Sequence, residues 1–127
     1  MGAAYYIVLD NDDPGFETSV NGKAVARDRD ALVGITDKLK LPAIDELASF
    51  ADLAAEFRVD PELPAAKEKW FDPAEGLEWV RAVREYIEAN PNCAKKPEAV
   101  IADLDEYEHV LSKAQGIDAK WHFAVDI

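Results

Sequence analysis

The alternating run that ends the chain, "WHFAVDI" at residues 121–127, constrains the fold more than any other feature. Apolar side chains occupy every second position, which is the period of a strand with one buried face: Trp121, Phe123, Val125 and Ile127. A single strand leaves its backbone groups unpaired and therefore needs a partner. The segment 4–10, rich in aromatic and β-branched residues, is the natural partner. The sequence leaves open whether the two strands run parallel or antiparallel.

Two further strands are expected on either side of the dipeptide Asn21-Gly22. The segment "FETSV" before it alternates apolar and polar residues, and "KAVAR" follows it. Asn-Gly is a strong hairpin signal because a type I′ turn requires positive φ at both central residues. The N-terminal quarter is therefore predicted to be a three-stranded meander.

After Asp28 the apolar residues take the spacing of a helix. The first helix is expected to begin at Asp28 or Asp30 and to end before Pro42, with apolar positions at 32, 35 and 39. The Ala-rich segment 42–57 forms either one bent helix or two short ones, and both remain open. Two prolines predict that Val59–Ala66 is a connecting loop.

The two helices of the C-terminal half have the clearest signals. One begins with Asp72 as N-cap and Pro73 at its first position, and it ends at the sequence "NPN". The other follows Pro97 and ends at Gly116. Each carries an apolar stripe at spacings of three and four: Leu77, Val80, Val83 and Ile87 in the first, and Val100, Leu104, Tyr107, Leu111 and Ala114 in the second.

These elements predict one α+β domain over residues 1–127. A chain of this length with 49% hydrophobic residues can bury a core without a disulfide or a metal. The expected sheet is small and mostly antiparallel, built from the N-terminal meander and the C-terminal strand. About four helices are expected to pack on one face of it.

The acidic stretch "DNDDPGFE" at residues 10–17 raises the question of a metal-binding loop. In a calcium loop of the EF-hand type that started at Asp10, Gly15 would fit its position. Pro14 and Asn21 would then occupy the places of an oxygen ligand and of the bidentate glutamate, which fails the pattern. We interpret the stretch as the loop of a hairpin, in which Asp and Asn side chains accept local backbone hydrogen bonds, with weak cation binding as the alternative.

His122 is a candidate because it shares a strand face with Asp126. An antiparallel pairing of the first and last strands would bring His122 near Asp10, whereas a parallel pairing would bring Asp126 there instead. A polar metal or acid–base site at Asp10, His122 and Asp126 therefore depends on the strand direction. The alternative is a structural histidine.

Other reactive side chains lack a catalytic context. Cys93, the only cysteine, precedes two lysines whose charge would favour its thiolate, but no histidine or acid lies close to it in sequence. The chain has no nucleophile elbow, phosphate-binding glycine loop or dinucleotide fingerprint. We expect no cofactor and favour a non-enzymatic protein.

Net charge is the one extreme of the composition, at −12 from 26 acidic and 14 basic residues. The imbalance is concentrated in residues 41–64, with six acids and one base, and in residues 97–127, with seven acids and two bases. Such a field repels nucleic acid and anionic membranes and attracts basic proteins. Solubility alone is the alternative explanation.

A contact surface is expected on the last two helices, from one aromatic and several acidic residues. Trp79 lies off the apolar stripe of its helix, close to two arginines, and Trp and Arg are enriched in binding hot spots. The acidic residues Asp103, Asp105 and Glu106 of the last helix complete the expected surface. Trp79 as a core-edge residue is the alternative.

Residues 70–127 carry a pattern of capped helix, second helix and aromatic final strand in "FDPAEGLEWVRAV", "DLDEYEHVL" and "WHFAVDI". This part resembles short acidic bacterial proteins of unknown function, similar in style to immunity proteins that neutralise toxins. The resemblance implies a binding protein and no particular functional residues.

The sequence thus favours a cytoplasmic, non-enzymatic module whose acidic surface binds a basic protein. A small enzyme or ligand-binding domain with a pocket between sheet and helices is the alternative, and the chain is expected to be a monomer or a homodimer. The single cysteine fits a reducing compartment, and no apolar stretch approaches the ~20 residues of a membrane span.

Overall fold

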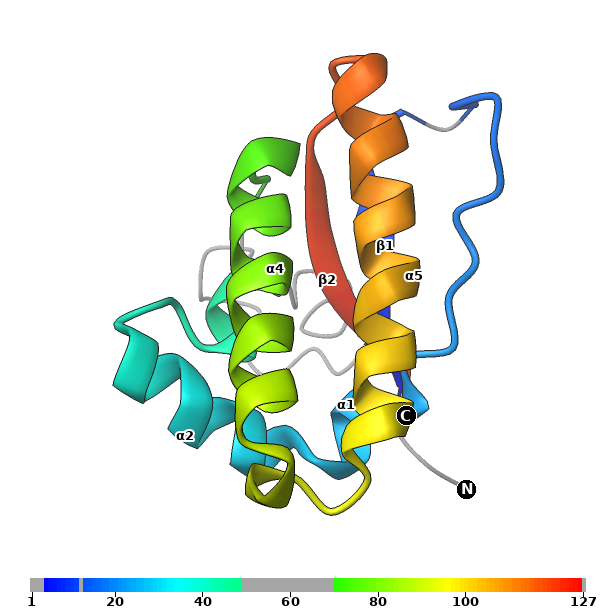
Figure 1. The fold of residues 1–127 in the computed structure, drawn as a ribbon. Coiled ribbons are helices and arrows are strands. Elements are labelled where there is room, and N and C mark those ends of the chain that lie inside the picture. Colours follow the sequence, from blue (N-terminus) through cyan, green and yellow to red (C-terminus); the bar gives the residue numbers. More distant parts are fainter. Residues whose placement is uncertain (1–3, 12, 49–69, 127) are drawn as a thin grey trace, which may run out of the picture.

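The computed structural model describes residues 4–11, 13–48 and 70–126. The predictions of one or two helices in 42–57, from residue 49 onward, and of a loop at Val59–Ala66 lie outside these residues. In the described part the first and last strands pair and helices pack against them, which confirms the α+β class (Figure 1).

The sheet consists of β1 (Ala4–Leu9) and β2 (Trp121–Asp126), which run antiparallel. Leu9 pairs with Trp121 and Ala4 with Asp126, so the two ends of the chain meet at one edge of the fold. Beyond the last pair, the Asp10 N–H donates to the Lys120 carbonyl at 3.0 Å. The predicted pairing of first and last strands is confirmed, and its direction is now known.

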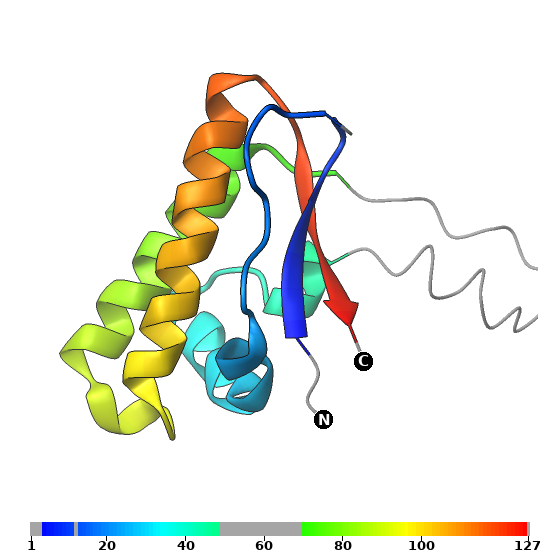
Figure 2. The same cartoon turned by 90° about the vertical axis from the view of Figure 1, so that its right-hand side faces the viewer.

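One face of the sheet is covered by a hairpin of two long helices, α4 (Pro73–Ala89) and α5 (Pro97–Gly116), joined by the short 3₁₀ helix η2 (Pro91–Cys93). Figure 2 shows this layering from the side, with the helices on one side of the two strands. Every residue of the two predicted apolar stripes is buried. Both helix predictions are therefore confirmed.

Three shorter elements lie between β1 and α4 in the chain. They are α1 (Lys23–Arg27), α2 (Arg29–Leu39) and the 3₁₀ helix η1 (Ile44–Leu47). Asp28 occupies the N-cap position of α2, and α2 ends before Pro42 as expected.

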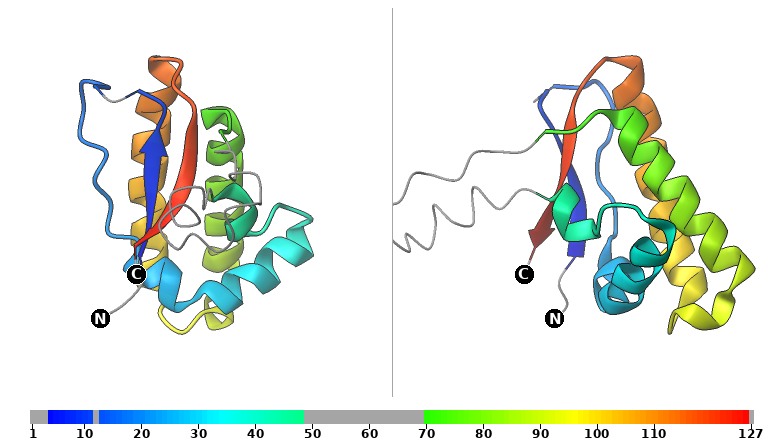
Figure 3. Two further views of the ribbon diagram at one scale, coloured as in Figure 1. Left: turned by 180° about the vertical axis from the view of Figure 1, so that it is seen from behind. Right: turned by 90° about the vertical axis from the view of Figure 1, so that its left-hand side faces the viewer.

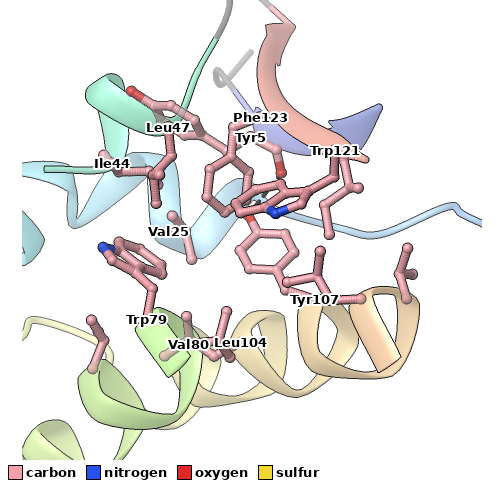
Figure 4. Close-up of a cluster of buried hydrophobic side chains, with 14 of the residues drawn as sticks. Tyr5, Val25, Ile44, Leu47, Trp79, Val80, Leu104, Tyr107, Trp121 and Phe123 are labelled. Atoms are coloured by element: carbon pink, nitrogen blue, oxygen red, sulfur yellow. Dashed lines mark hydrogen bonds between the residues drawn. The ribbon is translucent and has the colours of Figure 1, made fainter. Parts of the chain in front are cut away.

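Phe123 is the centre of the core between sheet and helices (Figure 4). Its ring is fully buried and meets four other aromatic rings edge-on or tilted, with centroids 4.8–6.3 Å away: Tyr5, Trp79, Tyr107 and Trp121. Such geometries suit the charge distribution of aromatic rings. At Gly76 of α4 a Cβ atom would lie 2.5 Å from the Trp121 ring, so glycine is what lets the indole lie against this helix.

The predicted three-stranded meander is not found, because "KAVAR" forms the helix α1 and "FETSV" belongs to no strand. Gly22 does adopt a positive φ of 68°, but it precedes a helix instead of turning a hairpin. A Cβ atom there would lie within 2 Å of the Tyr5 carbonyl oxygen. The Asn-Gly signal was therefore correct for the positive φ of Gly22 but wrong for Asn21, whose φ is not positive, and wrong for the element that follows.

Candidate functional site

The three residues of the predicted polar site do not come together. His122 pairs with Val8 in the middle of the sheet, whereas Asp126 pairs with Ala4 at one end and Asp10 lies beyond the other. The exposed Asp10 carboxylate accepts the Lys120 N–H at 2.9 Å, so it ties the ends of the two strands together. Nowhere in the described part do three or more His, Cys, Asp or Glu side chains gather as a metal would require.

His122 is buried, with only 4% of its surface exposed. Its Nδ1 lies 3.0 Å from the Phe123 carbonyl, and its ring centroid lies 4.5 Å from that of Trp70. Nε2 has no hydrogen-bond partner among the residues that the structure describes. The described surroundings of His122 are therefore aromatic and backbone, as in the structural alternative.

The acidic opening loop forms the predicted local bend, but it is not the loop of a hairpin, because the described residues 13–22 contain no strand before α1. Asn11 Oδ1 accepts the Asp13 N–H at 3.0 Å, and Gly15 supplies a positive φ of 83°. Asp12 lies outside the described residues. From this bend the chain runs on alongside the sheet to Gly22 (Figure 3).

Two members of the predicted contact surface are buried. Trp79 is 2% exposed and its Nε1–H donates to the Pro42 carbonyl at 2.8 Å, so it belongs to the core. Asp103 is 3% exposed. Neither side chain is available to a partner. In both cases a hydrogen-bond partner distant in sequence holds the side chain inside the fold, and the sequence does not reveal that partner.

Asp103 instead fixes the start of α1. Its Oδ2 accepts the N–H groups of Ala24 and Val25 at 3.0 and 3.1 Å. One turn further along α5, Glu106 Oε1 accepts the Asn21 N–H at 2.8 Å. The first N–H groups of a helix have no partner within it, and α5 supplies acceptors from outside. This explains why residues 23–27 are helical.

Burial raises the pKa of the Asp103 carboxyl, and the two backbone hydrogen bonds oppose that change. The proton affinity of this group therefore reflects a competition between lost hydration and direct donors.

Asp28, like Asp103, is a buried carboxylate that accepts backbone N–H groups of a distant segment, and the sequence did not predict this role. It is 4% exposed, and its two carboxylate oxygens accept the N–H groups of Lys95 and Lys96 at 3.2 and 3.1 Å. The sequence identifies Asp28 only as a helix cap. No pattern in the sequence indicates that its acceptors serve the connection before α5.

Polar bonds also hold η1 against the sheet. Tyr5 donates its hydroxyl to Asp45 at 2.7 Å, and Arg29 Nε donates to the same carboxylate at 2.9 Å. Burial, followed by the adjacent Asp45 carboxylate, raises the pKa of Tyr5 to about 12. This cluster joins β1, α2 and η1 and is fully explained by that structural role.

Cys93 is half-buried near the start of α5. Burial raises the pKa of its thiol, against a smaller opposing effect of Lys38. The thiolate is therefore disfavoured, in contrast to the sequence-based expectation from the neighbouring lysines.

The outer face of the α4–α5 hairpin is rich in charged side chains. These two helices carry nine acidic side chains and three basic ones. Both arginines of α4 are engaged by acids of the same face: Arg81 Nε lies 2.7 Å from Glu108, and Arg84 contacts Asp105 at 2.8 Å and Glu108 at 3.0 Å. Asp105 is thus the one exposed member of the predicted surface set that pairs with an arginine.

Three exposed glutamates of this face make no ion pair with any described residue: Glu75, Glu78 and Glu85. They share one side of α4 by their spacing of three and seven. We call them the glutamate row.

Among the described residues no helix is long and apolar enough to span a membrane. Comparison of the chain with protein-family models, with curated proteins and with solved structures finds no match.

Proposed function

We propose that the protein is a non-enzymatic binding module whose acidic surface docks a basic protein, in the manner of an immunity-type inhibitor. A reducing, cytoplasmic setting is part of this proposal, since Cys93 is the only cysteine of the chain. The docking surface is the outer face of the α4–α5 hairpin.

The observation that carries the proposal is the state of the arginines on that face. Arg81 and Arg84 are bound by acids of α5, so they do not offset the glutamate row. A partner that approaches meets three exposed carboxylates on a rigid helix, within a molecule of formal net charge −12. Such a field accelerates association with a basic surface and disfavours acidic ones.

A pocket between sheet and helices, as the alternative enzyme or ligand-binding function requires, finds no support in the described core. The layer is occupied by the rings of Trp79, Tyr107, Trp121 and Phe123, each at most 2% exposed. The buried carboxylate Asp103, next to this layer, already holds two backbone N–H groups.

The test is capture of a partner on the immobilised chain from a lysate of the source cell, followed by measurement of its association rate. We expect a basic partner that binds at low salt and is released at high salt. Replacement of Glu75, Glu78 and Glu85 by Gln should slow association by about tenfold or more.

The matched control replaces three exposed acids outside the α4–α5 hairpin by Gln, namely Asp30, Asp37 and Glu46. It removes the same charge and should have a clearly smaller effect. Equal slowing by both triple variants would show that net charge alone acts, and capture of no basic protein at low salt would contradict the proposal.

A further inference from the structure

One edge of β1 is open, and the backbone pattern shows which residues face it. Even-numbered residues of β1 bond toward β2, because the Asp10 N–H donates to Lys120 and antiparallel strands bond at alternate residues. Odd-numbered residues therefore point their N–H and C=O groups to the other edge. The Tyr5 N–H confirms this, since it donates to the Gly22 carbonyl on that side at 3.2 Å.

Beyond Tyr5 this edge has no partner in the described part of the chain. Ile7 and Leu9 form no backbone or side-chain hydrogen bond there with any described residue. An unpaired strand edge is a template for an added strand. By contrast, the outer edge of β2 is already engaged, because Trp121 exchanges two backbone hydrogen bonds with Phe71 at 2.8 and 3.0 Å.

A groove of about 940 Å³ lies along the open edge of β1. One wall is β1 itself, at Tyr6, Ile7 and Val8, and the other is the segment 18–21, which runs alongside (Figure 3). The Gly22 carbonyl closes the groove at the Tyr5 end. A strand residue occupies roughly 160 Å³, from a rise of about 3.3 Å, a strand spacing of about 4.8 Å and a layer of about 10 Å. The groove thus has the capacity for a short extended segment.

We propose that an extended segment of the basic partner enters this groove and adds to β1 as a third strand. The inference rests on the proposed function and names how the partner is held. Hydrogen bonds from Ile7, which lines the groove, supply the pairing, and Leu9 continues the same edge beyond the residues that line it. Glu17, which is exposed and next in sequence to the wall residue Thr18, suits a lysine or arginine that flanks the inserted segment. Lys23, which also lines the groove, favours an uncharged residue of the partner beside it.

A second copy of this chain fits the groove less well. The free edge of β1 has its own segment 18–21 beside it, so two copies cannot bring their β1 edges together without displacing both segments. Each copy also carries a formal charge of −12, which opposes association of like surfaces. A flexible basic segment meets neither obstacle.

The probe for the test is a capped synthetic peptide, Lys-Val-Thr-Val-Thr-Val-Lys. Two matched peptides keep its charge and side chains but carry N-methyl groups either on the three Val or on the two Thr residues. A strand offers alternate N–H groups to one neighbour, so we expect one methylated peptide to bind at least about tenfold more weakly, from the loss of two or more hydrogen bonds. The other should bind nearly as well as the parent.

Backbone amide exchange gives an independent readout on the unmodified protein. The parent peptide should slow hydrogen exchange at the Ile7 and Leu9 amides, with little change at Tyr5, whose N–H is already bonded. In a Thr18→Trp variant the new ring should fill the groove and abolish this protection. Ala102→Trp, at an exposed position of α5, is the matched control and should leave it unchanged.

A Lys-Gly peptide of equal charge distinguishes this inference from the proposed function. Equal binding of that peptide, or equal loss for both methylated peptides, would overturn strand addition while leaving the acidic docking face intact. Binding of neither peptide would count against both proposals. A dimer that dissociates on Thr18→Trp substitution would identify a second copy as the occupant and would overturn the inference.

Discussion

Two buried regions of this protein are stabilised in different ways. Phe123 packs against four other aromatic rings, and these contacts depend on shape and apolar area. At the start of α1 and before α5, two buried carboxylates, Asp103 and Asp28, hold backbone N–H groups of distant segments. The first region joins sheet to helices, and the second holds the backbone where α1 and α5 begin.

The difference concerns how each region responds to substitution. An aromatic core loses free energy in proportion to the volume removed, and a similar apolar residue restores much of it. A buried carboxylate that holds backbone donors is less replaceable, because its removal leaves N–H groups without partners. Substitutions in the two regions should therefore differ in which replacements rescue stability.

The largest expected effect is that of Phe123→Ala. Loss of the central ring leaves a cavity among four aromatic neighbours, and the free energy of unfolding should fall by about 3–5 kcal/mol. Phe123→Leu retains most of the volume and should cost clearly less. Urea unfolding monitored by circular dichroism measures both. Equal losses for the two variants would show that cavity volume is not what matters at this position.

Asp103→Ala should follow, with a loss of about 2–3 kcal/mol, because the Ala24 and Val25 N–H groups become unsatisfied in a buried place. Asp103→Asn keeps an acceptor oxygen and should retain more than half of this stability. Asp103→Leu, which has similar bulk but no acceptor, should behave like Ala. Rescue by Leu would make the site an ordinary core position and would remove the contrast with Phe123.

Most of the fold that could be predicted from sequence lies in elements with a regular period. The stripes of α4 and α5 and the alternation of β2 identify buried residues directly, because each pattern reflects the geometry of its own element. The pairing of β1 with β2 followed from the need of a terminal strand for a partner. Its direction did not, since an alternating pattern is the same in both senses.

The errors arose where a distant side chain decides the local structure. Residues 23–27 become helical with the help of Asp103 and Glu106, which lie about 80 positions away in sequence. The sequence left Trp79 between a contact surface and a core-edge position and placed Asp103 on that surface, because their partners, the Pro42 carbonyl and α1, cannot be recognised from local spacing. The groove along β1 was hidden for the same reason, since its second wall was expected to be a strand.

The pH dependence of stability should show the buried carboxylate directly. Burial raises the pKa of Asp103 in the folded state above its usual 3.8, so the folded protein binds its proton more tightly than the unfolded chain. The contribution of Asp103 to the free energy of unfolding is therefore fully present below pH 3.8 and is lost as the pH rises through the pKa of the folded state. Asp103→Asn should flatten this decline in unfolding curves recorded from acid to neutral pH. An unchanged slope would mean that the two N–H donors cancel the effect of burial.

Glu108 should show the opposite sign and the smallest effect. Hydrogen bonds from Arg84 and then Arg81 lower the pKa of this carboxyl from 4.5 to about 2. The unfolded chain binds the proton more tightly, so the contribution of Glu108 is present above about pH 4.5 and is lost as the pH falls toward 2. Because both arginines reach solvent, screening limits the value of this pair to roughly 1 kcal/mol or less. Glu108→Gln should reduce stability by that amount at neutral pH and low salt, and by less in 1 M salt. Asp103→Asn, whose site is buried, should keep its effect in 1 M salt, and a similar salt dependence for both variants would contradict the distinction between the buried and the exposed carboxylates.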